Sequence, residues 1–270
     1  MNHDTLKPLL DIMHQLRSAE GCPWDREQTH ESLRPFAIEE SYEVAEAVDN
    51  HDLSALVDEL GDLLLQVVFH AVIGEENAEF SMEDVVAAVC TKMQRRHPHV
   101  FAETHVDNSA QVLAQWEAIK ALERKDKPKE SALDGVTKNL PALMAANKLQ
   151  SKAAKVGFDW PTVQGVWDKL EEEKAEILEA LQAEQQEAVE EEVGDFLFAA
   201  VNLARFLHVE PESALLKANQ KFKSRFIAME KLAKQNQMDF SKLNLEQQEA
   251  LWQQVKKNKK GKTLCVSINI

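Results

Sequence analysis

Apolar residues recur at helical spacing along most of the chain. Near the N-terminus they fall at Leu6, Leu9, Leu10, Met13 and Leu16, a stripe on one side of a helix. The same spacing predicts further helices near residues 35–50, 54–74, 81–97, 109–124, 141–155, 162–182, 185–208, 211–235 and 245–258. Only 8 Gly and 8 Pro interrupt the 270 residues. So few turn residues favour helices over sheets, and we expect an all-α protein.

A polar segment, KDKPKESALDG (125–135), separates two series that contain the same number of predicted helices. We therefore expect a first repeat over residues 1–124, a linker over 125–140, a second repeat over 141–258 and a basic tail over 259–270. The tail contains GKT (261–263), but Lys256 stands where a phosphate-binding loop requires its first glycine. No helical pattern follows GKT either, so the sequence does not support a phosphate-binding loop there.

The two halves repeat the same motifs. EESYE (39–43) recurs as EEKAE (172–176), and ELGD (59–62) recurs as EVGD (192–195), each pair 133 residues apart. The further matches are KMQRR (92–96) with KFKSR (221–225), WEAIK (116–120) with WQQVK (252–256), and GCPW (21–24) with GFDW (157–160). Acids, bases and tryptophans agree in one order, so the chain contains an internal duplication.

The repeated acids lie along apolar helix stripes rather than opposite them. Glu40 and Glu43 share a helix face with Val44 and Ala47, as i, i+3 and i+4 neighbours do. Acidic runs on helices are usually solvated faces, which would put the acids on the other side. Several carboxylates buried together require a compensating cation or protonation. Because all the candidate ligands are oxygens, we expect magnesium, with manganese as an alternative.

Composition narrows the choice of partners. The formal net charge of −15 would repel a nucleic acid backbone, so nucleic acid is not an expected partner. Cys22, Cys90 and Cys265 have no metal-ligand spacing and indicate reduced thiols in a cytoplasmic protein. The sequence contains no apolar run long enough for a membrane helix, and its first helix does not resemble a secretory signal.

The pattern EExxE followed by ExxD resembles the MazG family of nucleoside triphosphate pyrophosphohydrolases, in its two-repeat bacterial form. GCPWD (21–25), RRHPHVF (95–101), SALD (131–134) and VGFDW (156–160) are also similar to that family. The resemblance extends from residue 1 to about residue 258. It implies two tandem MazG-type helical-bundle repeats in a homodimer, as part of the all-α nucleoside triphosphate pyrophosphatase superfamily.

The resemblance also implies a reaction and a set of metal ligands. Water would attack the α-phosphate of a nucleoside triphosphate, and pyrophosphate would leave. Broad base tolerance and a role in clearing the nucleotide pool are expected, since no motif reads a particular base. The carboxylates expected to bind Mg²⁺ are Glu40, Glu43, Glu59 and Asp62 in the first repeat, and Glu173, Glu176, Glu192 and Asp195 in the second.

Other residues have the chemistry needed around such a site. Glu39 and Glu172 are not obvious ligands, and either could orient or deprotonate the attacking water. The candidates for binding the triphosphate or the nucleoside are Lys92, Arg96, Lys221, Arg225, Trp252 and Lys256. Lys221 and Arg225 lie one helical turn apart, so both can point at the same phosphate chain. Trp24 and Trp160, in glycine-led loops, could line a nucleotide pocket or anchor the core.

One detail favours the second repeat as the working one. Lys92 and Arg96 fall at the end of a helix that Pro98 stops, whereas Lys221 and Arg225 lie inside a longer predicted helix. We interpret His97 and His99 as a structural corner, and His70 as a packed or hydrogen-bonded side chain. Two alternative functions stay open: a narrower dUTPase or phosphoribosyl-ATP pyrophosphohydrolase, and a non-catalytic metal-binding helical scaffold.

Overall fold

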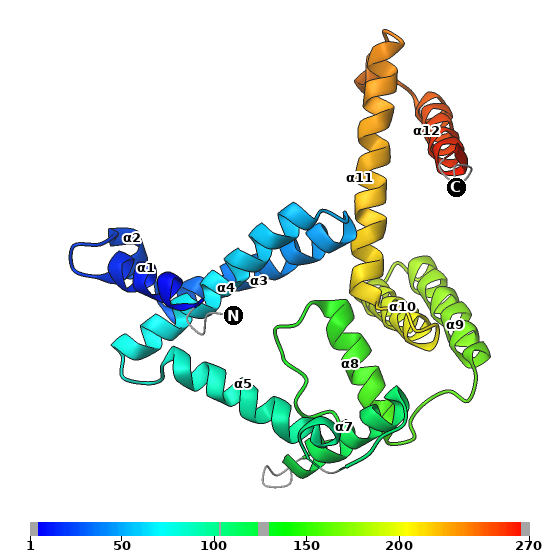
Figure 1. The fold of residues 1–270 in the computed structure, drawn as a ribbon. Coiled ribbons are helices and arrows are strands. Elements are labelled where there is room, and N and C mark those ends of the chain that lie inside the picture. Colours follow the sequence, from blue (N-terminus) through cyan, green and yellow to red (C-terminus); the bar gives the residue numbers. More distant parts are fainter. Residues whose placement is uncertain (1–4, 103, 124–129, 266–270) are drawn as a thin grey trace. The chain divides into compact units, whose positions relative to one another are not determined.

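The computed structural model describes residues 5–102, 104–123 and 130–265. In these residues every regular element is a helix, which confirms the all-α prediction. The chain divides into two compact units, residues 1–128 and 129–270 (Figure 1).

Unit 1 is built around a pair of long helices. Its elements are α1 (Lys7–Arg17), α2 (Pro23–Glu27), α3 (His30–Asp49), α4 (Leu53–Glu76), α5 (Met82–Arg96), α6 (Pro98–Phe101) and α7 (Ser109–Glu123). The helices α3 and α4 pack along each other as a hairpin, and α1 covers α4 (Figure 1). Met13, Leu33, Val68, Phe69 and Val72 are fully or almost fully buried in the core between these three helices. This core fixes α3 against α4.

Unit 2 repeats the arrangement. Its elements are α8 (Ala142–Lys155), α9 (Val163–Gln182), α10 (Gln186–Phe206), α11 (Pro211–Gln235), the 3-10 turn η1 (Phe240–Lys242) and α12 (Leu245–Cys265). The α9–α10 pair corresponds to α3–α4, α8 covers α10 as α1 covers α4, and α11 packs on α8 and α10. A separate core of Met229, Ala233, Leu251 and Val255 joins α11 to α12.

Both hairpins turn in the same way. His51 and Glu184, 133 residues apart, have φ near 55° and adopt the left-handed conformation that closes a helix C-terminus. Before α4, Asp52 accepts hydrogen bonds from the backbone N–H groups of Ser54 and Ala55 and caps the helix. The acidic motifs of each repeat lie on the two helices joined by this turn. The turn therefore sets their relative register.

Most predicted helices are present, with differences at their ends. The α3 helix starts at His30 rather than near 35, because a capping box of Thr29 and Ser32 starts it ahead of Pro35. As predicted, α5 stops just before Pro98, with its last residue at Arg96. A separate short helix then begins at Pro98. The short elements α2, α6 and η1 were not predicted, because they offer too few residues for a periodic signal.

The predicted tail differs most. The helix α12 continues to Cys265, beyond the predicted helix end near residue 258. Lysine has good helix propensity, and positive charge near a helix C-terminus complements its dipole, so Gly261 does not stop the helix. Residues 266–270 of the tail and 125–129 of the linker lie outside the described residues. Among the helices described, none is both long and apolar enough to cross a bilayer.

The left-handed turn generates a stability prediction. Glu184→Gly should raise the free energy of unfolding by about 1 kcal/mol, because glycine adopts a positive φ without the steric cost that a Cβ imposes. Urea unfolding would measure the change. Glu184→Ala is the matched control, since it removes the charge but keeps the Cβ. Equal stabilisation by both variants would attribute the effect to charge rather than to backbone conformation.

Candidate metal centre and nucleotide site

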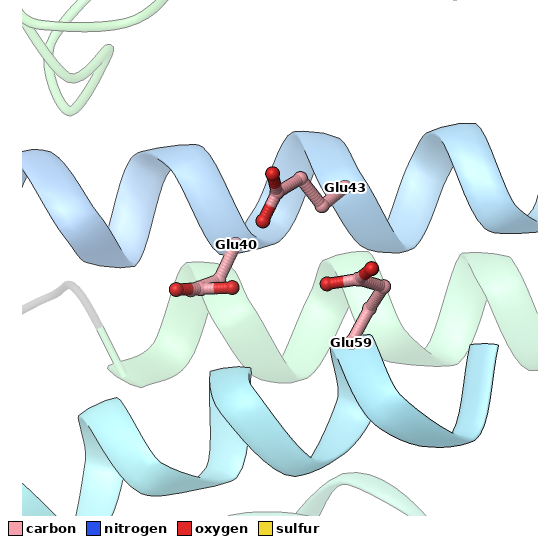
Figure 2. Close-up of side chains that lie close together, drawn as sticks. All are labelled: Glu40, Glu43 and Glu59. Carbon is pink, nitrogen blue, oxygen red and sulfur yellow. The ribbon is translucent and has the colours of Figure 1, made fainter. Parts of the chain in front are cut away.

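In unit 1 the first acidic motif meets the second across the α3–α4 hairpin. Glu40 and Glu43 on α3 and Glu59 on α4 bring carboxylate oxygens within 4.8 Å of one another, and Figure 2 shows the three side chains lying close together. Burial, reinforced by Asp62 and Glu43, raises the pKa of Glu40. Burial, followed by Glu43 and Asp62, also raises the pKa of Glu59. All four predicted ligands therefore share one electrostatic environment.

Unit 2 contains the equivalent cluster. Glu173 on α9 and Glu192 and Asp195 on α10 bring carboxylate oxygens within the same 4.8 Å. Burial raises the pKa of Glu192, and repulsion from Glu176 and Glu173 raises it further. Burial is likewise the main cause that raises the pKa of Glu176, and Glu173 adds to it. The hairpin thus gathers the four expected carboxylates, two from each helix.

Glu173 is the most constrained member of the cluster. Its residue is 2% exposed, and its Oε2 has no hydrogen-bond partner among the residues described. Lys169, one turn earlier on α9, places its Nζ 2.7 Å from Glu173 Oε1 and 2.7 Å from Glu172 Oε1. These contacts raise the pKa of Lys169, with the Glu172 hydrogen bond first and the Glu173 bond second. One buried carboxylate oxygen is therefore paired and the other is available.

Lys169 was not predicted from the sequence. Its only signal is the i, i+4 spacing to Glu173, which is common on helix surfaces. The equivalent position in the first repeat, 133 residues earlier, is Phe36. The lysine is therefore not among the residues that the two repeats share. In unit 1, Phe36 packs edge-on against Trp24 with ring centroids 6.1 Å apart. The two clusters therefore contain equivalent acids, but only the cluster of unit 2 has a lysine beside it.

The residues present fit a hard divalent cation. Each cluster supplies only carboxylate oxygens, the ligand type that magnesium and manganese prefer. Glu40 Oε2 in unit 1 and Glu173 Oε2 in unit 2 are both buried, and neither meets a hydrogen-bond donor in the described part of the chain. A buried carboxylate oxygen without a partner is costly, and a cation would satisfy it.

Two of the residues predicted to bind the triphosphate or the nucleoside lie against each other in unit 2. Arg225 on α11 lies over the ring of Trp252 on α12, with its guanidinium carbon 5.6 Å from the ring centroid. Arg225 Nε is buried and has no hydrogen-bond acceptor among the described residues. Lys221 is exposed one turn before Arg225, and Lys256 is half-buried one turn after Trp252. Arg225 and Trp252 thus form a common surface, flanked by two lysines.

The corresponding arginine of unit 1 is already paired. Arg96 Nη2 lies 2.6 Å from Glu123 Oε2, and Arg95 Nη2 lies 2.6 Å from Glu123 Oε1. These two arginines hold the pKa of Glu123 at about 2, well below its usual range, with the Arg96 hydrogen bond as the main cause. Lys92 is exposed on the same helix. Arg96 therefore ties α5 to α7, whereas Arg225 Nε is left without such a partner.

The remaining candidates occupy different surroundings. Glu39 is exposed on α3, and Glu172 is exposed on α9 but bound to Lys169. Trp160 lines a cavity of about 680 Å³ in unit 2, which Lys169, Glu173 and Asp195 also line. The cavity therefore joins an aromatic wall to the second acidic cluster.

The three histidines singled out in the sequence, His70, His97 and His99, are all hydrogen-bonded. His97 Nδ1 lies 2.7 Å from the carbonyl oxygen of Met93, and His99 Nδ1 lies 3.1 Å from Gln115 Oε1, so both secure the corner after α5. His70 shares a hydrogen bond of 2.7 Å with His30, and burial lowers its pKa. These contacts confirm the reading of His70 as a hydrogen-bonded side chain.

Comparison with known proteins places both clusters inside recognised domains. The family model described as the MazG nucleotide pyrophosphohydrolase domain matches residues 28–101 and again 162–226. These ranges contain both acidic motifs of both units. The chain belongs to the MazG family. Its two MazG domains confirm the tandem-repeat prediction.

Relatives of similar length carry matching descriptions. A nucleoside triphosphate pyrophosphohydrolase of Escherichia coli (strain K12) is 49% identical over 252 residues, covering 92% of this chain and 96% of that protein. A Thermotoga maritima protein described as nucleoside triphosphate pyrophosphohydrolase/pyrophosphatase MazG is 47% identical, covering 92% of this chain and 94% of that protein. A solved mazG-related protein of Thermotoga maritima is 30% identical, with a TM-score of 0.37, and covers 43% of this chain and 98% of that one. Each of the first two relatives therefore matches this chain over nearly its full length.

The pairing of Glu123 generates a pH-dependent prediction. Its folded-state pKa lies near 2, below the ordinary value of 4.5, so its stabilising effect is complete above about pH 4.5 and is lost as the pH falls towards 2. Glu123→Gln should therefore unfold at lower urea concentration than the wild type at pH 7. The difference between the two urea midpoints should decrease as the pH falls from 4.5 to 3.

Glu117→Gln is the matched control on the same helix, because Glu117 makes an exposed pair with Lys120. Such surface pairs contribute little, so this variant should stay close to the wild type at every pH. A gap for Glu123→Gln that does not change with pH would show that the arginine pairs do not stabilise unit 1.

Proposed function

We propose that the protein is a Mg²⁺-dependent nucleoside triphosphate pyrophosphohydrolase, which converts a triphosphate and water to a monophosphate and pyrophosphate. The observation that carries this proposal is Glu173, a buried carboxylate with one oxygen unpaired, among three further acids and at the wall of a cavity. The descriptions of its long MazG relatives support the same reaction.

The carboxylates of unit 2 are proposed to hold the cation. Glu173, Glu176, Glu192 and Asp195 supply oxygen ligands from two helices whose register the Glu184 turn fixes. When bound, Mg²⁺ lowers the pKa of water and neutralises charge on the phosphates. The equivalent residues Glu40, Glu43, Glu59 and Asp62 supply the same donor set in unit 1.

Other residues of unit 2 would bind the substrate and move the proton. Lys169 stands between Glu172 and Glu173, so it can hold a phosphate oxygen beside the acids. Lys221 and Arg225 supply further positive charge, and Trp252 and Lys256 flank them. Glu172 is proposed to accept the proton of the attacking water. The water oxygen then bonds to the α-phosphorus, and the bond from that phosphorus to the bridging oxygen breaks as pyrophosphate leaves.

We propose that unit 2 performs the reaction and that unit 1 is weakly active or structural. The acids of unit 1 have Phe36 beside them where unit 2 has Lys169, and Arg96 is paired with Glu123. A transferred triphosphate needs nearby cations as well as carboxylates. In unit 1, Glu39 is equivalent to Glu172. However, Phe36 stands there in place of Lys169, and Arg96 is already paired with Glu123.

A homodimer is proposed as the working assembly. The hairpin of unit 1 exposes Leu53, Val57, Leu60 and Leu64 along α4, beside the acidic motif of Glu59 and Asp62. Exposed apolar surface of this extent is typical of an interaction face, and a second copy of the hairpin would cover it and shield the acids. Broad base tolerance, nucleotide-pool clearance and a cytoplasmic location remain predictions from the sequence.

Product analysis tests the proposed reaction. ATP, GTP, CTP, UTP and the deoxynucleotides incubated with protein and Mg²⁺ should yield monophosphate and pyrophosphate, separated by chromatography. Glu176→Ala should lower turnover about a hundredfold or more, because it removes a metal ligand, whereas the matched Glu43→Ala in unit 1 should retain most activity.

Each alternative has its own outcome. Diphosphate and phosphate as products would overturn the proposed bond cleavage. Turnover of dUTP alone or of phosphoribosyl-ATP alone, when both are added to these nucleotides, would favour the narrower enzyme. Loss of activity in Glu43→Ala but not in Glu176→Ala would assign the reaction to unit 1.

Metal binding should also be visible without turnover. Added Mg²⁺ should raise the unfolding free energy by about 2.7 kcal/mol when its free concentration is about 100 times its dissociation constant. Thermal unfolding with and without Mg²⁺ measures this, and EDTA should reverse it. NaCl at matched ionic strength controls for screening of the acidic clusters. An equal effect of NaCl would exclude specific cation binding, whereas Mg²⁺-linked stability without turnover would favour the scaffold alternative.

A further inference from the structure

The cavity of unit 2 has polar groups that the proposed phosphate chemistry does not use. It is lined by residues of α8, α9, α10 and the segment 157–160, and its volume of about 680 Å³ is in the range of small-molecule sites. Lys169, Glu173 and Asp195 line it, together with Gln150 and Asn202. The last two have amide groups rather than charges.

Gln150 presents a fixed hydrogen-bond acceptor. The residue is 7% exposed on α8, and its Nε2 donates to the backbone carbonyl of Phe198 on α10 over 2.8 Å. That bond settles the orientation of the amide. Its Oε1 is buried and meets no donor within the described ranges. A buried amide oxygen left unpaired costs about 1–3 kcal/mol, so a ligand with an N–H group would relieve it.

Asn202 presents the complementary group. Arg205 Nε donates to Asn202 Oδ1 over 2.9 Å, so the Nδ2 amino group is the part of this amide that can meet a ligand. Arg205 also makes two hydrogen bonds to Asp159, of 3.0 and 2.5 Å. These bonds attach segment 157–160, which comes directly after α8, to helix α10. The orientation of Asn202 is therefore set by an ion pair next to the cavity.

The same segment supplies aromatic surface. Trp160 lines the cavity and packs on Gly165 of α9, where an added Cβ would meet the indole ring at 2.7 Å. Phe158 also lines the cavity and is 83% exposed, so it is not held in a core. Flat aromatic faces beside a donor and an acceptor suit a planar heteroaromatic ligand.

Unit 1 lacks this arrangement at the equivalent positions. The residues 133 positions before Asn202 and Arg205 are Phe69 and Val72. Both are buried in the core that joins α1, α3 and α4. Polar groups in unit 2 thus replace core residues of unit 1. Arg205 is satisfied by Asp159 and by Asn202 Oδ1, which leaves the Asn202 amino group to face the cavity.

We propose that this cavity is the nucleobase subsite of unit 2, in which Gln150 Oε1 accepts from a base N–H and Asn202 Nδ2 donates to a base acceptor. This rests on the proposed function, because Lys169 and the acids on the same cavity would hold the triphosphate. Adenine, guanine, cytosine and uracil each offer an N–H donor next to an acceptor on the pairing edge. The subsite therefore accepts all four bases and disfavours a base that lacks an N–H donor.

A substrate without the donor tests the acceptor. The purine base of purine riboside triphosphate has neither an exocyclic amino group nor an N1 hydrogen, and otherwise has the shape of adenine. The wild type should turn over ATP with a kcat/KM about three- to tenfold higher, the equivalent of one hydrogen bond. Gln150→Met should remove this preference by raising KM for ATP with little change in kcat, because it alters binding and not the reacting groups.

The matched control is Gln182→Met, which makes the same exchange at an exposed position at the end of α9. It should keep the preference for ATP. Circular dichroism and thermal unfolding establish that Gln150→Met is folded. If it is not folded, the comparison of the two triphosphates with the wild type decides alone.

Equal kcat/KM for the two triphosphates in the wild type would overturn the proposal, as would a preference that persists in folded Gln150→Met. Failure of the proposed function gives a different result, namely no hydrolysis of either nucleotide by the wild type. In that case equilibrium binding of the same two triphosphates measures the cavity directly. A preference for ATP that depends on Gln150 would support the nucleobase subsite, and equal binding would overturn it.

Discussion

Electrostatic repulsion among carboxylates is the constraint on which the rest of this structure depends. Two antiparallel helices bring four acids together along faces that also form the core, and burial raises the pKa of Glu40 and Glu192. Such a cluster is unfavourable unless something compensates its charge. Other interactions must therefore stabilise the hairpin against this repulsion. They also position the carboxylates where a cation can bind.

The holding interactions lie at both ends of the hairpin. At one end, the left-handed residues His51 and Glu184 reverse the chain and set the helix register. Towards the other end of the hairpin in unit 1, Met13, Leu33 and Phe69 bury apolar surface between three helices. Between these two ends of the unit 1 hairpin, Glu43 is exposed and Glu40 and Glu59 are half-buried.

Duplication allowed the two repeats to diverge around an unchanged acidic frame. Unit 1 keeps the apolar residues Phe69 and Val72 in its core, where unit 2 has Asn202 and Arg205 beside a cavity. Unit 1 pairs Arg96 with Glu123, whereas Arg225 lies over Trp252 with its Nε unpaired in the described structure. A filled core favours the stability of unit 1, and an open cavity favours binding by unit 2. The proposed roles of the two units therefore agree with the general competition between stability and function.

The sequence alone determined the helical class, the duplication and the four acids of each repeat, because periodicity and spacing are local properties of the chain. It also indicated the helix stop before Pro98, since proline restricts the residue that precedes it. It did not indicate Lys169, whose contacts with Glu172 and Glu173 depend on burial, or the extension of α12 to Cys265. Only the tertiary structure decided which polar groups are left unpaired. Gln150 and Asn202 are ordinary amides in the sequence. In the structure Gln150 Oε1 becomes an acceptor and Asn202 Nδ2 a donor of fixed direction, because Phe198 and Arg205 of α10 bond the other end of each amide.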